Sequence, residues 1–139
     1  MTKQRSIMVV EDNPDDLALT LAAFDNHNIV NDILVARDGA EALDVLFGPD
    51  AQCELPSVVL LDLKLPKISG IEVLKAIRAS DRTRFLPVVI LTTSSQDEDR
   101  MDGYRFGANS YVRKPVEFDR FIEAARLLGL YWVITNEAA

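Results

Sequence analysis

Short runs of β-branched and aliphatic residues recur along the chain, and a segment of helical length follows each run. Five runs are expected to form strands, at residues 6–10, 32–36, 57–61, 87–92 and 110–113. The segments that follow them carry apolar residues at spacings of three and four, as amphipathic helices do, at residues 15–24, 39–47, 70–80, 97–107 and 117–130. This alternation predicts a doubly wound α/β fold, in which right-handed crossovers join five parallel strands and five helices cover both faces of the sheet.

The size and charge of the chain limit its organisation and its partners. Its 139 residues, of which 48% are hydrophobic, predict a single domain over residues 1–139, with residues 129–139 as a C-terminal tail. The net charge is −7 and Lys and Arg do not cluster, so direct binding of nucleic acid is not expected. No run reaches the length of about eighteen apolar residues that spans a membrane, and the first apolar run is too short for a signal peptide. We therefore expect a cytoplasmic protein without membrane contact.

Acidic residues follow two of the predicted strands. Glu11 and Asp12 come after the first strand, and Asp62 comes after the third. Ligands of open parallel sheets bind beyond the carboxyl ends of the strands, where the direction of winding reverses. If the first and third strands are neighbours, three carboxylates converge, and their mutual repulsion favours a bound cation. Carboxylate oxygens completed by water and a backbone carbonyl suit Mg²⁺.

A simpler interpretation is that Asp12 only caps the helix that begins in "NPDD". Asn13 can supply that cap instead. We therefore favour the metal site over capping alone.

Two more polar residues are expected at the same edge of the sheet. The fourth strand ends at Thr92, and the fifth is followed by Lys114, whose backbone is restricted by Pro115. Alone, Thr92 would be interpreted as a turn residue and Lys114 as a solvated one. Beside a metal ion and a carboxylate, their hydroxyl and ammonium groups could bind the oxygens of a phosphoryl group. The combination predicts a site that holds a phosphoryl group on a carboxylate.

Four segments, "SIMVVED", "VVLLDLKLPKISGIEVL", "VVILTTSS" and "SYVRKP", resemble the receiver domains of two-component response regulators in order and spacing. The resemblance covers essentially the whole chain and implies a flavodoxin-like sheet with the strand order 2-1-3-4-5. It implies that Asp62 is the phospho-acceptor, that Asp12 binds Mg²⁺ directly and that Glu11 binds it mostly through water. The backbone carbonyl of Lys64 would complete the protein ligands.

The same resemblance implies a switch. Thr92 would be the hydroxyl that moves toward the phosphoryl group, Lys114 the ammonium that contacts it, and Tyr111 the aromatic side chain that rotates in response. From the residues alone, Tyr111 would more often be a packing residue. A receiver accepts its phosphoryl group from a sensor histidine kinase and then changes its protein–protein interactions. It is not an enzyme in the usual sense, since it only phosphorylates itself from acyl phosphates and dephosphorylates itself.

Three other functions fit parts of this pattern. A haloacid-dehalogenase-like phosphohydrolase also forms an aspartyl phosphate beside Mg²⁺, but it needs a second Asp two residues later, where this chain has Lys64. A flavodoxin-like electron carrier holds its flavin phosphate in a Ser/Thr/Gly-rich loop, whereas the loop after the first strand here is the acidic "EDNPDD". A receiver that serves as an intermediate in a phosphorelay is the third alternative.

The segment after Lys114 is long enough for one helix and a short tail, so we expect no attached output domain. The tail carries more large apolar side chains than one helix face can bury: Leu128, Leu130, Tyr131, Trp132, Val133 and Ile134. We expect a two-fold homodimer through this tail, the last two predicted helices and the fifth strand. The alternative is a tail that folds back on its own domain. The tail and "KLPKISG" resemble single-domain regulators of bacterial and cyanobacterial phytochromes, which implies a bacteriophytochrome kinase as partner and a role in light signalling.

Overall fold

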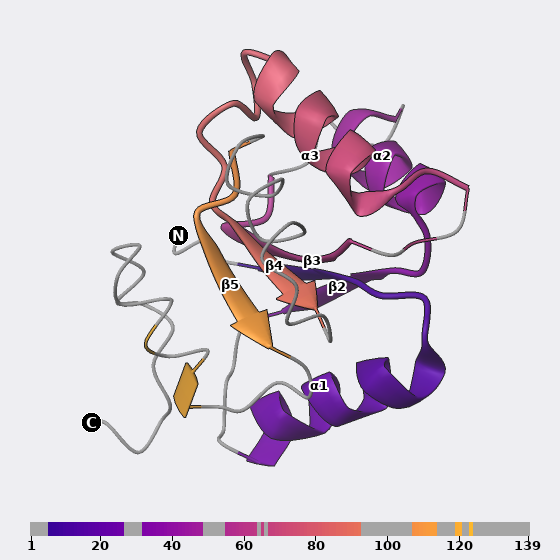
Figure 1. The fold of residues 1–139 in the computed structure, drawn as a ribbon, viewed down its shortest axis with the longest axis vertical. Coiled ribbons are helices and arrows are strands. Elements are labelled where there is room, and N and C mark those ends of the chain that lie inside the picture. The colour runs from indigo at the N-terminus through magenta and orange to yellow at the C-terminus, as the bar shows by residue number, and fades with distance from the viewer. Residues whose placement is uncertain are drawn as a thin grey trace.

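Five parallel strands form a single sheet in the order β2-β1-β3-β4-β5 (Figure 1), as predicted. The computed structural model describes residues 6–26, 32–48, 55–63, 65, 67–92, 107–113, 119, 120 and 123. The strands are β1 (Ile7–Val10), β2 (Ile33–Ala36), β3 (Val58–Asp62), β4 (Val88–Thr92) and β5 (Ser110–Arg113). Each differs from its predicted range by no more than one residue at either end.

Three helices within the described residues cover the sheet on both faces. They are α1 (Pro14–Asn26), α2 (Gly39–Phe47) and α3 (Gly70–Ala79), and α1 lies on the opposite face from α2 and α3 (Figure 1). The predicted helices at 97–107 and 117–130 lie almost entirely outside the described residues, so the count of five stays a prediction. Of the helices described, none has the length and apolar character that crossing a membrane requires.

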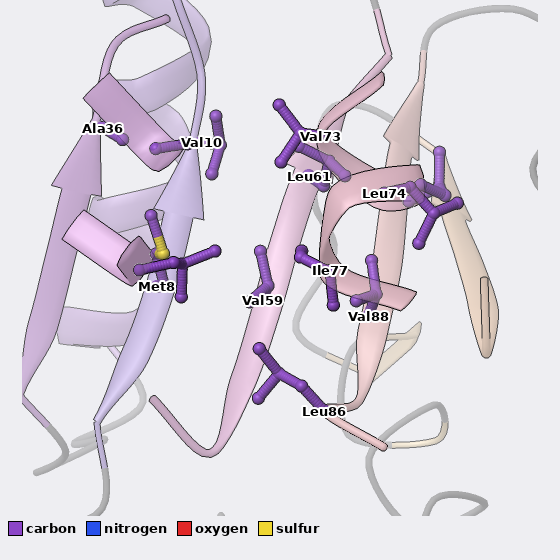
Figure 2. Close-up of a cluster of buried hydrophobic side chains, with 13 residues drawn as sticks. Met8, Val10, Ala36, Val59, Leu61, Val73, Leu74, Ile77, Leu86 and Val88 are labelled. Atoms are coloured by element: carbon purple, nitrogen blue, oxygen red, sulfur yellow. The ribbon is translucent and has the colours of Figure 1, made fainter. Parts of the chain in front are cut away.

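The strands are apolar at successive positions because both faces of the sheet are covered. Neighbouring residues of a strand point to opposite faces. Alternate residues of β1 and β3 therefore pack toward α1 in one cluster, with Leu17 and Phe24 of the helix. The residues between them pack toward α2 and α3. Figure 2 shows Met8, Val10, Val59 and Leu61 of the strands with Val73, Leu74 and Ile77 of α3. These two layers hold β1 and β3 rigidly in the centre of the fold.

Each described helix begins with a side-chain cap near the carboxyl end of the preceding strand. Asn13 Oδ1 accepts hydrogen bonds from the backbone N–H groups of Asp15 and Asp16, at 2.9 and 3.1 Å. Asp38 caps α2 by accepting from the N–H of Glu41, and Ser69 caps α3 in the same way. Such caps satisfy N–H groups that the helix itself leaves without acceptors. The loops at this edge of the sheet are therefore held close to the strand ends.

Candidate phosphoryl-acceptor and metal site

Three carboxylates meet at the carboxyl end of the sheet. One carboxylate oxygen from each of Glu11, Asp12 and Asp62 lies within 4.8 Å of the others. This proximity follows from the pairing of β1 with β3, in which Val10 is level with Leu61. The next residues along the two strands therefore emerge side by side. The structure brings together the three residues that the sequence singled out, and their role as metal ligands stays a prediction.

Two of these carboxylates are buried and the third faces solvent. The exposed fraction of Glu11 is 1% and that of Asp62 is 6%, whereas Asp12 is exposed. Negative charges so close together repel one another, and a bound cation would offset that repulsion. The exposed side gives such a cation an entry path and room for bound water.

The chemistry of the donors fits Mg²⁺. The cluster offers carboxylate oxygens only, without His or Cys. Mg²⁺ prefers oxygen ligands and usually retains several waters, which an open site beside Asp12 permits. Lys64, whose carbonyl was expected as a further ligand, lies outside the described residues.

Asn13 supplies the helix cap that the simpler interpretation assigned to Asp12. Its side chain accepts from two N–H groups of the first helical turn. Its own backbone N–H also donates to Glu11 Oε2 at 3.3 Å. Asn13 therefore starts α1 and orients the carboxylate of Glu11. Because the cap is provided elsewhere, Asp12 is available to a cation, which favours the metal site over capping alone.

Gly70 allows α3 to begin directly behind the phospho-acceptor candidate. Its N–H donates to the carbonyl oxygen of Leu63 at 3.0 Å. A Cβ atom at this position would collide with the backbone carbonyl oxygen of Asp62. The absence of a side chain therefore lets the start of α3 pack against the end of β3.

The ends of β4 and β5 reach the same edge of the sheet. Asp62 pairs with Leu91, so Thr92 stands one residue beyond the level of Asp62 on the neighbouring strand. The side chain of Thr92 lies outside the described part of the chain, as does Lys114. Their contacts with a phosphoryl group therefore stay predictions.

Tyr111 is level with Ile90 of β4. Its side chain is partly buried and packs against the hydrophobic cluster beneath α2 and α3. A packing contact is therefore present, and the rotation of this side chain stays a prediction.

Two residues near the site were missed by reasoning from the sequence. The carboxylate of Asp38 lies 3.3 Å from the ammonium of Lys67, measured from Oδ2 to Nζ. The hydrogen bond from the N–H of Glu41 lowers the pKa of Asp38, and Lys67 lowers it further. "DGAE" at residues 38–41 carries the spacing of a capping box, which could have identified Asp38. No local signal points to Lys67 as its partner.

Comparison with known proteins assigns the family. The model of the response regulator receiver domain matches residues 7–126. The probable methanogenesis regulatory protein FilR2 of Methanothrix harundinacea (strain 6Ac) is 40% identical over 133 residues, which cover 95% of this chain and 86% of that protein.

Two solved structures are similar over nearly their whole lengths. The bacteriophytochrome response regulator AtBRR has a TM-score of 0.87 and 46% identity, with coverage of 97% of this chain and 99% of that one. The Mn²⁺-bound form of response regulator Rcp1 has a TM-score of 0.75 and 30% identity, with coverage of 93% and 94%. By its sequence and its fold, the chain belongs to the family of response regulator receiver domains.

Proposed function

We propose that this receiver domain accepts a phosphoryl group on Asp62 while Glu11, Asp12 and Asp62 hold Mg²⁺. The observation that carries the proposal is the approach of the three carboxylates to within 4.8 Å at the end of the sheet. The metal-bound Rcp1 structure supports the choice of a divalent cation. Mg²⁺, when bound, would offset the charge of the carboxylates and of the phosphoryl oxygens.

Asp62 suits the role of nucleophile better than its two neighbours. It is the last residue of β3, which has β1 on one side and β4 on the other. Glu11 follows the last residue of β1, and Asp12 is exposed. A nucleophile held by the rigid centre of the sheet loses little freedom when it meets the phosphorus atom.

The transfer proceeds from a phosphohistidine of a sensor kinase. A carboxylate oxygen of Asp62 forms the new bond to phosphorus, and the bond between phosphorus and the imidazole nitrogen breaks. The second nitrogen of the ring takes a proton from solvent before this bond breaks, so the imidazole that keeps the electron pair leaves as a neutral side chain. Lys114 and the hydroxyl of Thr92 would bind the phosphoryl oxygens, and Tyr111 would follow the movement of Thr92.

Labelling by acetyl phosphate tests this assignment. Wild-type protein with Mg²⁺ should gain one phosphoryl group by intact mass, which is labile in acid and in base, and Asp62→Asn should gain none. Asp81→Asn is the matched control, because the Asp81 side chain is fully exposed and its ion pair with Arg84, at 3.6 Å, lies in the segment before β4. Labelling of Asp62→Asn to the wild-type extent would refute the role of Asp62.

The proposed donor is a histidine kinase of the bacteriophytochrome type, acting in the cytoplasm, where it can be charged from ATP. The similarity to AtBRR over almost the whole chain supports this donor. FilR2 bears the name of a regulator of a different process, so the donor is best decided by phosphotransfer kinetics. A bacteriophytochrome kinase should transfer its phosphoryl group much faster than unrelated kinases. Onward transfer from Asp62 to a histidine phosphotransfer protein would instead indicate a phosphorelay intermediate.

The proposed output is a change in protein contacts, including those of a homodimer. The apolar tail, from Leu128 to Ile134, supports the dimer by its composition and lies outside the described residues. Burial of three of its large side chains would contribute about 5 kcal/mol before the cost of association is subtracted. An isologous contact closes on itself and would not propagate into larger aggregates.

A further inference from the structure

The loop between β3 and α3 is held in an unusual conformation at Lys67. The φ angle of Lys67 is 67°, in the left-handed region that residues other than glycine seldom adopt. Among the described non-glycine residues, Lys67 alone has a positive φ. Such a conformation persists only where the surroundings hold it in place.

Lys67 forms an ion pair with Asp38, the N-cap residue of α2. Its ammonium lies 3.3 Å from Asp38 Oδ2, with 68% of the Lys67 side chain and 17% of the Asp38 side chain exposed. The other oxygen of Asp38 accepts from the N–H of Glu41 at 2.7 Å. The hydrogen bond that caps α2 therefore fixes the orientation of the Asp38 carboxylate. Through this carboxylate, the ion pair with Lys67 connects the start of α2 to the loop between β3 and α3.

The next residue of the loop lies directly on the same helix. The carbonyl oxygen of Ile68 occupies the place where a Cβ atom of residue 39 would be, and Gly39 makes this approach possible. Where α3 begins, the N–H of Gly70 donates to the carbonyl oxygen of Leu63, and Gly70 packs on the backbone of Asp62. The loop therefore contacts α2 at Lys67 and Ile68 and the end of β3 at Gly70.

This loop begins immediately after the phospho-acceptor candidate. Lys67 is five residues from Asp62 along the chain, so a displacement of the turn at Lys67 has a short covalent path to Asp62. Small displacements of reacting groups slow a transfer strongly, because the reacting atoms must approach along a defined line.

We propose that Lys67 is a positioning residue for the phosphoryl-acceptor site, and that it acts by tying the loop after Asp62 to the capped start of α2 through Asp38. The inference rests on the proposed function of Asp62. Lys67 is exposed and lies outside the carboxylate cluster, but it would support metal binding and phosphoryl transfer through the position of this loop.

The test separates the ion pair from the backbone conformation and from the helix cap. Lys67→Asn removes the ammonium but keeps a residue that tolerates a positive φ. Asp38→Asn removes the charge but keeps an oxygen that can cap α2. Lys67→Arg retains the positive charge and should behave almost as the wild type. Asp81→Asn breaks another exposed ion pair, with Arg84, and serves as the control.

Three measurements are compared across these variants: the dissociation constant for Mg²⁺ by calorimetry, the rate of labelling by acetyl phosphate, and the exchange rate of the Gly70 amide in metal-free protein. Lys67→Asn and Asp38→Asn should each weaken Mg²⁺ binding and slow labelling by about twofold to fivefold, as expected for an exposed ion pair. Both should accelerate exchange at Gly70. The double variant should be no worse than either single one, because both remove the same pair.

The outcomes distinguish this inference from the function on which it rests. If wild-type protein is labelled on Asp62 but Lys67→Asn matches it in all three measurements, Lys67 has no positioning role. If wild-type protein takes no label, the proposed function fails. In that case, the inference is decided by the two measurements that need no label. If the Gly70 exchange rate and the Mg²⁺ affinity of Lys67→Asn equal those of the wild type, the inference fails as well. If both change as expected, Lys67 still positions the loop after Asp62.

Discussion

Arg78 of α3 donates two hydrogen bonds to the carbonyl oxygen of Gly107, from Nε at 2.9 Å and from Nη2 at 2.7 Å. The same guanidinium donates to the carbonyl oxygens of Arg84 and Leu86 and to Asn109 Oδ1. Each of these acceptors is a neutral oxygen, and burial lowers the pKa of Arg78. One side chain thus ties the end of α3 to the segments that precede β4 and β5. It anchors β5 at the end opposite to the candidate site.

Replacement of Arg78 by Met should destabilise the protein by about 2 to 4 kcal/mol, because the half-buried carbonyl oxygens of Gly107 and Leu86 lose their donor. Arg78→Lys should recover only part of the loss, since an ammonium cannot reproduce the planar fork. Urea denaturation measures the free energy of unfolding of both variants and of the wild type. Arg84→Gln is the matched control, because that arginine side chain is 54% exposed. Equal stabilities of Arg78→Met and Arg84→Gln would contradict the anchor.

Magnesium should stabilise the unphosphorylated fold, because it binds the clustered carboxylates of the folded state. At about ten times its dissociation constant the gain should be about 1.4 kcal/mol. Asp12→Asn should weaken binding at least about tenfold and lose most of this gain at the same concentration. Thermal unfolding with and without MgCl₂, at ionic strength matched by NaCl, measures the effect. A melting temperature indifferent to Mg²⁺ in the wild type would exclude the metal site.

Acid should remove the stabilisation that ionised Asp38 provides. The hydrogen bond from the Glu41 N–H, with a smaller contribution from Lys67, lowers the pKa of Asp38 below its ordinary value of 3.8. The folded state therefore favours the carboxylate, and its contribution is complete above pH 3.8 and lost as the pH falls through the lower folded pKa. The stability difference between wild type and Asp38→Asn should be constant near neutral pH and shrink below pH 3.8. A difference that grows on acidification would show that the sign is wrong.

Thr92→Ala should still accept a phosphoryl group but respond to it weakly. The nucleophile and the metal ligands remain, whereas the hydroxyl proposed to follow the phosphoryl oxygen is absent. Binding of the phosphorylated and unphosphorylated variant to its partner kinase measures the response, with Asp62→Asn as the baseline that cannot be phosphorylated. A full wild-type change in affinity would mean that coupling runs through other residues.

Truncation after Leu127 should convert the proposed dimer to a monomer, because it removes the apolar tail. A chain that ends at Thr135 is the control, since it loses only the polar end of the tail and should remain dimeric. Sedimentation at micromolar concentration compares the two with the intact protein. Monomers in all three, with equal solubility, would favour the tail that folds back on its own domain.

The local pattern of residues determined most of the fold. A central strand that is covered on both faces must be apolar at successive positions, so β1, β3 and β4 could be located from composition alone. The cap at Asn13 was also predictable, because the backbone N–H groups that donate to its side chain lie within three residues in the chain. The convergence of Glu11, Asp12 and Asp62 followed once β1 and β3 were taken as neighbours, since parallel strands end at one edge. The strand order itself came from the family resemblance.

Only the tertiary structure decided which loops meet. Asp38 and Lys67 lie in different loops, and Arg78 of α3 contacts Gly107 in the segment before β5. Periodicity carries no information about contacts between segments so far apart in the chain. Nothing in the residue type of Lys67 indicates its positive φ angle, because lysine seldom adopts the left-handed region. Local sequence selects a strand or a helix through backbone preference and burial, whereas the pairing of distant side chains depends on how the completed elements pack.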